Sequence, residues 1–196
     1  MVHNRIRLLY LGLITLAIGI PSVQAQMNIE IKGVGQSLYP VAVSRFKDEN
    51  KLPVSITDVV RQNLARSGYF KNTELGNGIE DDQVMPNFKI WGSRGADALA
   101  VGSVTEKLPG QYEIRYRLYD IRKGESLNGL IVSASADNLR LAAHRISDDI
   151  IFKLLGEKGV FSTRLSYVIK EGKRFRLVIS DADGQNIRNA LNSSEP

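Results

Sequence analysis

The sequence predicts an α+β fold, in which two helices pack on one mostly antiparallel or mixed sheet and an incomplete β-propeller blade follows. Three observations lead to this prediction. Residues 111–120 alternate strictly between apolar and polar side chains, as a half-buried strand does. Residues 56–64 and 138–155 carry apolar side chains at helical spacing, and the last 40 or so residues form a meander of short strands.

The first 25 residues predict a cleavable export signal. Arg5 and Arg7 give a positive start, an apolar run follows, and small residues precede the predicted cleavage after Ala25. A membrane anchor is the alternative, but the apolar run from Leu8 to Ile20 is shorter than the ~20 residues that a spanning helix needs. We therefore expect an exported protein whose mature chain begins at Gln26.

Charge and cysteine content narrow the function further. The net charge is +5, and the export signal holds two of the 26 basic residues and none of the 21 acidic ones, so the mature chain carries +3. This mild basicity is spread along the chain and gives no argument for nucleic acid as a partner. The chain has no cysteine, which excludes thiol catalysis and cysteine metal sites and fits the bacterial periplasm.

The first part of the mature chain predicts two strands and a helix. Residues 27–32 read as a short edge strand that Gly33 and Gly35 break, and residues 40–46 read as a second strand. Ser55 is the predicted N-cap of a helix that ends at Gly68. The apolar stripe of this helix consists of Ile56, Val59, Val60 and Leu64.

The middle of the chain predicts a surface loop at 75–87, a helical turn at 88–91 and three strands at 98–104, 111–120 and 127–134. Along the second of these strands one face is expected to be buried and the other wet. The expected buried side chains are Tyr112, Ile114, Tyr116 and Leu118, and the expected wet ones are Glu113, Arg115 and Arg117.

A second helix is predicted from Asn138 to Leu155, with Asp137 as its N-cap and Gly156 as its end. Its predicted buried stripe is Leu139, Ala142, Ala143, Ile146, Ile150, Leu154 and Leu155. The domain boundaries expected from this pattern are 1–25 for the export signal, 26–158 for the α+β domain and 159–196 for an incomplete first blade.

The last segment predicts strands at 164–170, 174–181 and 187–191, with turns at Gly172 and at Asp181–Gly184. Such a meander is one unit of the type that β-propellers repeat. Because a lone hairpin is marginally stable in water, we expect this unit to be part of something larger.

Histidine and aspartate offer the few candidates for chemistry. His3 lies in the export signal, so His144 is the only mature histidine. It is either a base or ligand, or a helix-surface histidine paired with Asp148, and the lack of a second ligand favours the surface pair. Asp181 and Asp183 suggest either a calcium loop or a β-turn, and the missing further ligands favour the turn.

Three other patterns have simpler structural explanations. Gly33-x-Gly35 lacks the rest of a phosphate-binding loop. The tyrosines at 112, 116 and 119 are expected in the core rather than in a carbohydrate platform. Lys173, Arg174 and Arg176 are expected to form a solvated face rather than an anion site. We therefore predict no catalytic, cofactor-binding or metal-binding residue, no cofactor and no small-molecule substrate, and a hydrolase is disfavoured because the chain has no recognisable nucleophile motif.

Several segments together resemble the TolB family, the periplasmic component of the Tol-Pal system. The segments that carry the resemblance are Tyr39–Phe46, Arg66–Phe70, Trp91 with Gly95–Gly102, Ala143–Asp148, Phe161–Val168 and Ser180–Asn186. No single motif is decisive, but their order and spacing are specific. The family places a small α+β domain before a six-bladed β-propeller, and this sequence stops just inside the first blade.

The resemblance implies a non-enzymatic periplasmic protein that supports outer-membrane integrity and envelope invagination during cell division. It implies a TolA-like inner-membrane partner bound by the mature N-terminus, through strand addition to a sheet edge. The residues implied in this contact are Gln26, Met27, Asn28, Ile29, Glu30, Ile31 and Lys32. The alternative is that this strand pairs within its own sheet. A Pal-like lipoprotein is implied as a partner only if a propeller is present, and the alternative function is a truncated fragment that lacks Pal binding and has no independent role.

Overall fold

The computed structural model describes residues 38–73 and 80–194. The predicted export signal, its cleavage site at Ala25, the predicted partner-binding segment 26–32 and the glycines at 33 and 35 lie outside these ranges. Within the described part of the chain, no helix has the length and apolar character needed to cross a membrane.

A five-stranded mixed sheet forms the centre of the α+β part. Its strands are β1 (Tyr39–Val43), β2 (Phe70–Asn72), β3 (Ala98–Leu108), β4 (Gln111–Asp120) and β5 (Glu125–Ser135). The strand order is β2-β1-β3-β4-β5, in which β1 runs parallel to both β2 and β3 while β3, β4 and β5 are antiparallel. The prediction allowed a mostly antiparallel or a mixed sheet, and the sheet is mixed.

Strand β2 was not predicted, because three residues are too few to show an alternating pattern. Within this strand Phe70 lies in the core, with 3% of its surface exposed. The helix between β1 and β2 carries the chain back across the sheet, which makes the two strands parallel.

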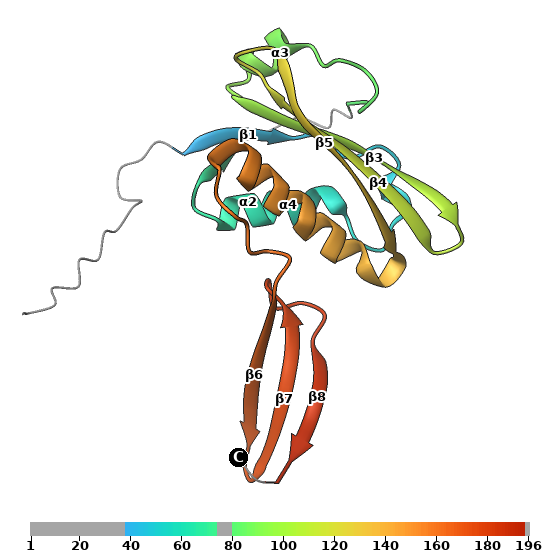
Figure 1. Ribbon diagram of the computed structural model, residues 1–196, viewed down its shortest axis with the longest axis vertical. Coiled ribbons are helices and arrows are strands. Elements are labelled where there is room, and N and C mark those ends of the chain that lie inside the picture. Colours follow the sequence, from blue (N-terminus) through green and yellow to red (C-terminus); the bar gives the residue numbers. More distant parts are fainter. Residues whose placement is uncertain (1–37, 74–79, 195–196) are drawn as a thin grey trace, which may run out of the picture. The chain divides into compact units, whose positions relative to one another are not determined.

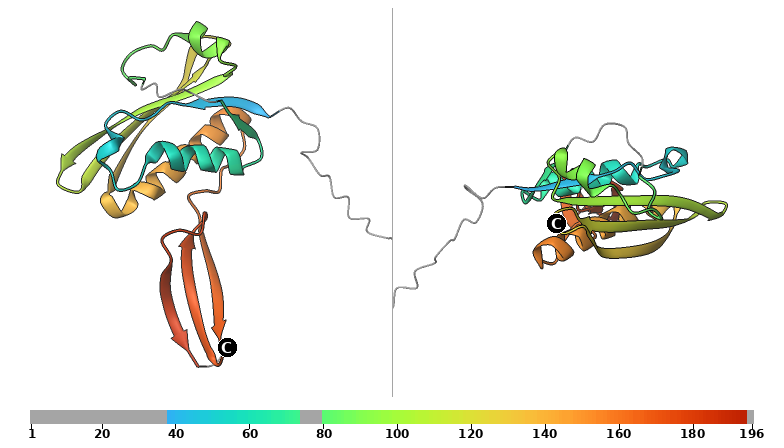
Figure 2. Two further views of the ribbon diagram at one scale, coloured as in Figure 1. Left: turned by 180° about the vertical axis from the view of Figure 1, so that it is seen from behind. Right: turned by 90° about the horizontal axis from the view of Figure 1, so that it is seen from above.

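Helices α2 (Ile56–Arg66) and α4 (Leu139–Leu155) pack side by side on one face of this sheet, and the short helix α3 (Phe88–Ser93) lies on the other side (Figures 1 and 2). The predicted pair of helices on one sheet is confirmed. Two single 3-10 turns, η1 (Glu49–Lys51) and η2 (Ala136–Asn138), precede α2 and α4.

The main core lies between the sheet and the two long helices. The apolar stripes predicted for both helices enter it, although Leu154 and Leu155 at the end of α4 are only partly buried. A second, smaller core lies under α3 and contains Trp91 and Tyr119. The outer face of β4 is therefore not entirely wet as predicted, because α3 covers the end of the strand near Tyr119.

The predicted helix caps are partly confirmed. The hydroxyl of Ser55 accepts a hydrogen bond from the backbone N–H of Asp58 over 3.1 Å, which caps α2. The predicted N-cap of α4 is wrong, because Asp137 lies in η2 and Asn138 occupies the N-cap position without a side-chain cap. Gly156 ends α4 in the left-handed conformation, with φ of 74°.

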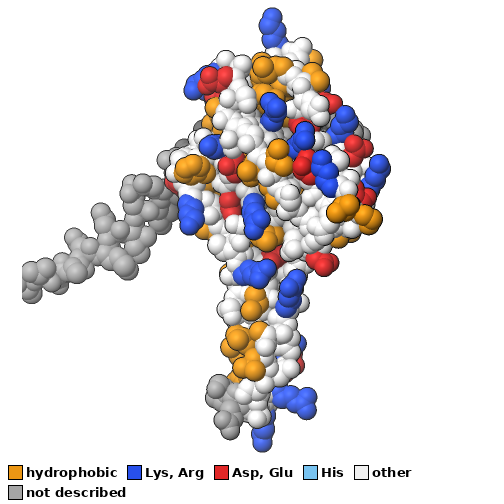
Figure 3. Space-filling model, turned by 45° about the vertical axis from the view of Figure 1, so that its right-hand side comes forward, with side chains coloured by type: hydrophobic (Ala, Val, Ile, Leu, Met, Phe, Trp, Pro, Cys, Tyr) orange, Lys and Arg blue, Asp and Glu red, His pale blue; other side chains and the backbone are white. Residues whose placement is uncertain are grey.

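The C-terminal strands form a separate antiparallel sheet in the order β6-β7-β8. Its members are β6 (Arg164–Glu171), β7 (Arg174–Asp181) and β8 (Arg188–Ser193), which confirms the predicted meander. Its identity as a propeller blade remains a prediction. Figure 3 shows hydrophobic side chains on its surface, and the exposed ones include Leu165, Val168 and Leu191.

Candidate functional site on helix α4

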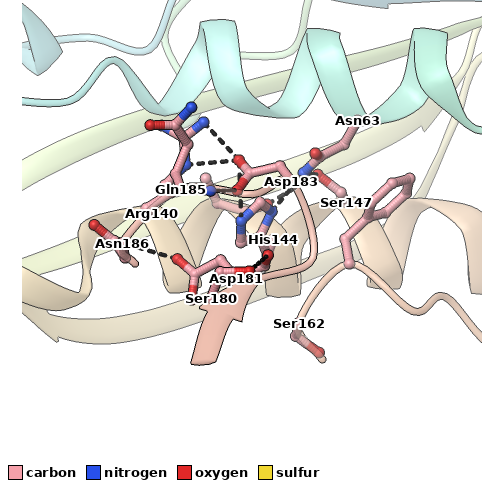
Figure 4. Close-up of polar contacts among 12 residues, drawn as sticks. Asn63, Arg140, His144, Ser147, Ser162, Ser180, Asp181, Asp183, Gln185 and Asn186 are labelled. Atoms are coloured by element: carbon pink, nitrogen blue, oxygen red, sulfur yellow. Dashed lines mark hydrogen bonds and ion pairs between the residues drawn. The ribbon is translucent and has the colours of Figure 1, made fainter. Parts of the chain in front are cut away.

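Helix α4 carries a line of polar residues in addition to its apolar stripe. Arg140, His144 and Asp148 follow one another at intervals of four residues, so they lie on one side of the helix. We call these three residues the α4 polar stripe. Arg140 and His144 face Asp183 in the turn at 181–186 between β7 and β8 (Figure 4). Asp148 contacts the linker at 159–162.

Arg140 and Asp183 form an ion pair that is largely shielded from solvent. The guanidinium Nε and Nη2 atoms lie 2.6 Å and 2.5 Å from Oδ2 of Asp183. The side chains are only 19% and 4% exposed. Burial opposes ionisation of Asp183, but the hydrogen bonds from Arg140 and from the backbone N–H of Gln185 outweigh it and lower the pKa of this carboxyl. Asp183 is therefore held as a carboxylate.

His144 is completely buried, so the predicted surface pair with Asp148 is wrong. Its Nδ1 atom lies 2.8 Å from the amide nitrogen of Asn63 on α2, and its Nε2 atom lies 3.5 Å from Oδ2 of Asp183. The prediction failed because α2 and the turn at 181–186 cover this side of α4, and both come from distant parts of the sequence. Asp148, the predicted partner of His144, is itself engaged by the following chain.

The surrounding hydrogen bonds fix the protonation of the His144 ring. Asn63 accepts from Arg66 through Oδ1 over 2.8 Å and donates to the Ser147 hydroxyl through Nδ2 over 2.9 Å. The Ser147 hydroxyl in turn donates to the backbone carbonyl of Ala143 over 2.9 Å. The Asn63 amide therefore presents N–H to His144, so Nδ1 accepts and the proton of the neutral ring sits on Nε2, facing Asp183.

Electrostatics agree with a neutral ring. Burial lowers the pKa of His144 below its ordinary value, and this effect exceeds the opposing influence of the carboxylates of Asp183 and Asp181. A charged ring would need a second N–H on Nδ1, which would face the N–H groups of Asn63.

Asp148 bonds the linker rather than the histidine. Its two carboxylate oxygens accept the backbone N–H groups of Phe161 and Ser162 over 2.8 Å and 2.9 Å. The linker approaches so closely that a Cβ atom on Gly159 would lie 2.3 Å from Oδ1 and 2.5 Å from Cα of Asp148. Phe161 then enters the main core, and the guanidinium of Arg66 lies 5.9 Å from the centre of its ring.

The predicted β-turn at Asp181–Gly184 is confirmed. The backbone N–H groups of Asp181 and Gly184 donate to the carbonyls of Gln185 and Asp181, each over 2.9 Å, and Gly184 has φ of 79°. The side-chain amide of Asn186 donates to Asp181 over 2.6 Å. The turn thus holds its own shape while presenting Asp183 to α4.

Among the described residues, His144, Asp181 and Asp183 place possible metal-ligand atoms within 4.8 Å of one another. Ligation through Nε2 requires the ring proton to move to Nδ1, where Asn63 presents a donor rather than the usual acceptor. Arg140 also occupies Asp183 with a positive charge. The donor set therefore fits a hydrogen-bonded cluster better than a metal centre.

The remaining candidates from the sequence are the three tyrosines of β4 and the basic residues of the β6-β7 hairpin. Tyr116 and Tyr119 are 1% and 2% exposed, and Tyr112 packs against the main core, which confirms the core interpretation of these tyrosines. The hydroxyl of Tyr116 donates to Asp149 of α4. Arg174 is exposed, and Arg176 pairs with Glu171 over 2.5 Å.

Sequence reasoning missed Asn63, Arg140 and Ser147. Asn63 had a usable signal, since it is a polar residue at a position of the apolar stripe of α2, between Val60 and Leu64. A buried polar side chain needs a partner, so this position indicates a polar contact with a neighbouring element. Ser147 had no comparable signal, because serine is common on any helix face.

The fold and the cluster define a class: a two-layer α+β domain with a mixed sheet, joined by polar contacts of its last helix to an antiparallel three-stranded sheet. The family of the TolB amino-terminal domain matches residues 27–127. The chain therefore belongs to the TolB family.

A solved structure agrees with this assignment. The crystal structure of TolB from Acinetobacter baumannii is similar with a TM-score of 0.70 and 26% sequence identity, over 82% of this chain and 40% of that one. This chain thus spans less than half the length of that protein. Two further structures have lower scores. Lipoprotein GNA1162 from Neisseria meningitidis has a TM-score of 0.40 and 18% sequence identity, over 59% of this chain and 98% of that one. The LpoB C-terminal domain from Salmonella enterica has a TM-score of 0.38 and 14% sequence identity, over 52% of this chain and 85% of that one.

Proposed function

We propose that this chain is a non-catalytic, periplasmic protein-interaction component of the Tol-Pal system, which supports outer-membrane integrity and envelope invagination during cell division. The observation that carries the proposal is the family match over residues 27–127. This match begins two residues after Ala25, the last residue of the predicted export signal. It therefore includes residues 27–32 of the segment 26–32, to which we assign partner binding.

The partner is a TolA-like inner-membrane protein, and the contact is strand addition by residues 26–32 to an open sheet edge of that partner. Ile29 and Ile31 alternate with Asn28 and Glu30, which suits an added strand with one apolar face. Main-chain hydrogen bonds supply the affinity in this mode, and alternate side chains supply the specificity.

The sheet order bears on the alternative, in which this segment pairs within its own chain. In the described residues β1 already has neighbours on both sides, β2 and β3. An additional strand of the same sheet has only the outer edges of β2 and β5 to use. Strand β5 offers the longer edge, with eleven residues against three. Intramolecular pairing and partner binding are compatible if the segment detaches.

A pull-down with the C-terminal domain of a TolA-like protein tests strand addition. Deletion of residues 26–32 is expected to abolish capture. Ile29→Pro is expected to do the same, because proline removes a ladder N–H group. Ile29→Val is the matched control, since it keeps the N–H group and the strand preference, and it is expected to retain capture. Undiminished binding by the deletion variant would overturn the strand-addition mechanism.

A complementation assay tests the cellular role. The full chain is expressed in a bacterial strain that lacks its own TolB-family protein, and detergent resistance is measured. Restored resistance supports a role in outer-membrane integrity. Unrestored resistance, with the exported chain present in the periplasmic fraction, supports the alternative of a fragment without independent function. Amino-terminal sequencing of the exported chain should give Gln26 as its first residue.

A further inference from the structure

Each residue of the α4 polar stripe turns at least one polar group toward the chain that follows α4. Asp148 binds two backbone N–H groups of the linker, Arg140 binds Asp183, and the N–H of the His144 ring faces the same carboxylate. A surface stripe of this composition would ordinarily face water. Here three successive turns of α4 contact the linker that leads into β6 and the turn that joins β7 to β8.

Helix α2 also supports the α4 polar stripe. Asn63 on α2 holds the His144 ring from its Nδ1 side, and Arg66 of the same helix reaches both Asn63 and the ring of Phe161. A single connected chain of polar contacts thus runs from α2 through α4 to the β7-β8 turn. Connected polar groups of this kind polarise one another, so we expect these contacts to be coupled.

The β6-β8 sheet has little else of its own to hold it. Its strands pair with one another, and the outer strands β6 and β8 are exposed along almost their whole length. Apolar side chains of these strands are also exposed, for example Val168 at 60% and Leu191 at 59%. The linker and the turn meet at one end of the sheet, because Arg164 at the start of β6 pairs with Asp181 at the end of β7. Their polar contacts with α4 therefore have a large share in positioning the sheet.

From these contacts we infer that the α4 polar stripe is a conformational lock, in which Arg140, His144 and Asp148 fix the linker at 159–162 and the turn at 181–186, and whose release frees the β6-β8 sheet to move as a separate body. This lies beyond the proposed function, since it assigns a device to residues outside the partner-binding segment. The central element of the lock is the ion pair between Arg140 and Asp183. Because both side chains are largely buried, removing either charge leaves the other without its partner.

Hydrogen exchange of the full chain, followed by mass spectrometry of its peptides, tests the lock. The variants are Asp183→Asn, Arg140→Gln and the double variant. The asparagine keeps the oxygen that accepts from Gln185, so the turn retains its own hydrogen bonds. Each single variant is expected to raise exchange in residues 159–193 at least about tenfold, as losing one partner of a buried pair should. Exchange in β3, β4 and β5 should stay unchanged.

The double variant should exchange no faster than the single ones, because each single substitution already removes the one ion pair that the two charges form. The matched control is Asp97→Asn, which breaks the ion pair of Asp97 with Arg122 on the surface of the α+β part. This control should leave residues 159–193 at the wild-type rate. Unchanged exchange in residues 159–193 in both single variants would overturn the lock. An equal rise in β3, β4 and β5 would overturn it too, because the contacts would then belong to the global fold.

Nitrogen-15 spectroscopy of the imidazole gives an independent readout. His144 is the only histidine after residue 25, so its two ring nitrogens are observed without overlap in the mature chain. The spectrum should show the neutral ring with the proton on Nε2. Asp183→Asn should shift the Nε2–H signal and leave Nδ1 as an acceptor from Asn63. A wild-type ring with its proton on Nδ1 would contradict the lock, because Nε2 would then present no N–H group to Asp183.

Discussion

The amide nitrogen of Asn63 lies 2.8 Å from Nδ1 of His144, so helix α2 decides which nitrogen of a histidine on α4 carries the proton. The ring has no exposed surface, and its other nitrogen faces Asp183. A buried, neutral histidine that is held in this way resists protonation. This resistance has a consequence for the pH dependence of stability.

The free energy of unfolding is expected to fall as the pH drops below about 6.5, the ordinary pKa of histidine. Burial lowers the pKa of His144 in the folded state, so between the two pKa values the unfolded chain binds a proton that the folded chain does not. The contribution is fully present above the unfolded pKa and is lost toward the folded pKa, with a slope of at most ~1.4 kcal/mol per pH unit. Urea unfolding between pH 5 and 7.5 measures it. The polar and charged groups that act on the ring are those of Asn63, Arg140, Asp148, Asp181 and Asp183.

His144→Gln serves as the control, because glutamine keeps a polar side chain and does not titrate. Its stability should be flatter than that of the wild type over the same pH interval. Equal slopes in the two proteins would contradict the assignment to His144. The lowered pKa of Asp183 acts in a separate window, since its stabilising contribution is lost only as the pH falls below the ordinary carboxyl value of about 4.

Gly159→Ala is expected to separate the linker from α4. A Cβ atom at this position would lie 2.3 Å from Oδ1 and 2.5 Å from Cα of Asp148, closer than atoms in contact allow. The linker must move, and the two hydrogen bonds from Phe161 and Ser162 to Asp148 weaken. We expect faster amide exchange at these two residues and a loss of about 1–3 kcal/mol, as for other overpacked sites. Gly92→Ala is the control, because its Cβ would meet Ile121 at an ordinary 3.6 Å.

Gly102→Ala is expected to destabilise the α+β part more severely than any other glycine substitution in β3 or β5. An added Cβ atom would lie 2.4 Å from the ring of Phe46 and 2.6 Å from the backbone carbonyl oxygen of Arg115. The carbonyl belongs to the paired strand β4 and cannot yield without breaking the ladder. The loss should reach or exceed about 3 kcal/mol and lower the melting temperature by several degrees.

Gly129→Ala on β5 provides the comparison for this effect. Its added Cβ atom would lie 3.5 Å from the backbone oxygen of Tyr116, which is ordinary contact. Its melting temperature should stay close to that of the wild type. A similar loss in both variants would show that strand glycines matter here for a reason other than close packing.

Ser55→Ala is expected to cost about 1 kcal/mol, the usual effect of removing an N-cap. The Ser55 hydroxyl accepts from Asp58 at the start of α2 and also lies 3.4 Å from the buried carboxylate of Glu49. Ser55→Thr keeps the accepting oxygen and should retain most of the stability. Thermal unfolding of the two variants measures the difference, and equal losses would refute the cap as the cause.

Local pattern predicted those elements whose structure depends on their own residues. The alternation of residues 111–120 predicted β4 with the bounds that the structure shows, because a strand with one buried face shows that face in every second side chain. The stripes of α2 and α4 were visible for the same reason at helical spacing. Asp181 and Gly184 predicted their turn, since a turn is specified by the few residues that form it.

Residues distant in sequence decided the rest. The parallel strand β2 exists because α2 returns the chain beside β1, and its three residues carry no periodicity of their own. Asp148 was assigned to His144 because the two are neighbours on one helix, whereas its partners come from the linker. His144 is buried because α2 and the β7-β8 turn meet over it, and no property of the α4 sequence specifies that.

The sequence by itself therefore determined the described strands other than β2, the two long helices and the turn at Asp181–Gly184, together with the family resemblance and the expectation of an exported, non-catalytic protein. Only the tertiary structure decided that Arg140, His144 and Asp148 face the following chain rather than water. The physical reason is that secondary structure follows from the periodic burial of neighbouring side chains. The burial of a polar side chain depends instead on which distant element covers it, and on whether that element brings the hydrogen-bond partner that burial requires.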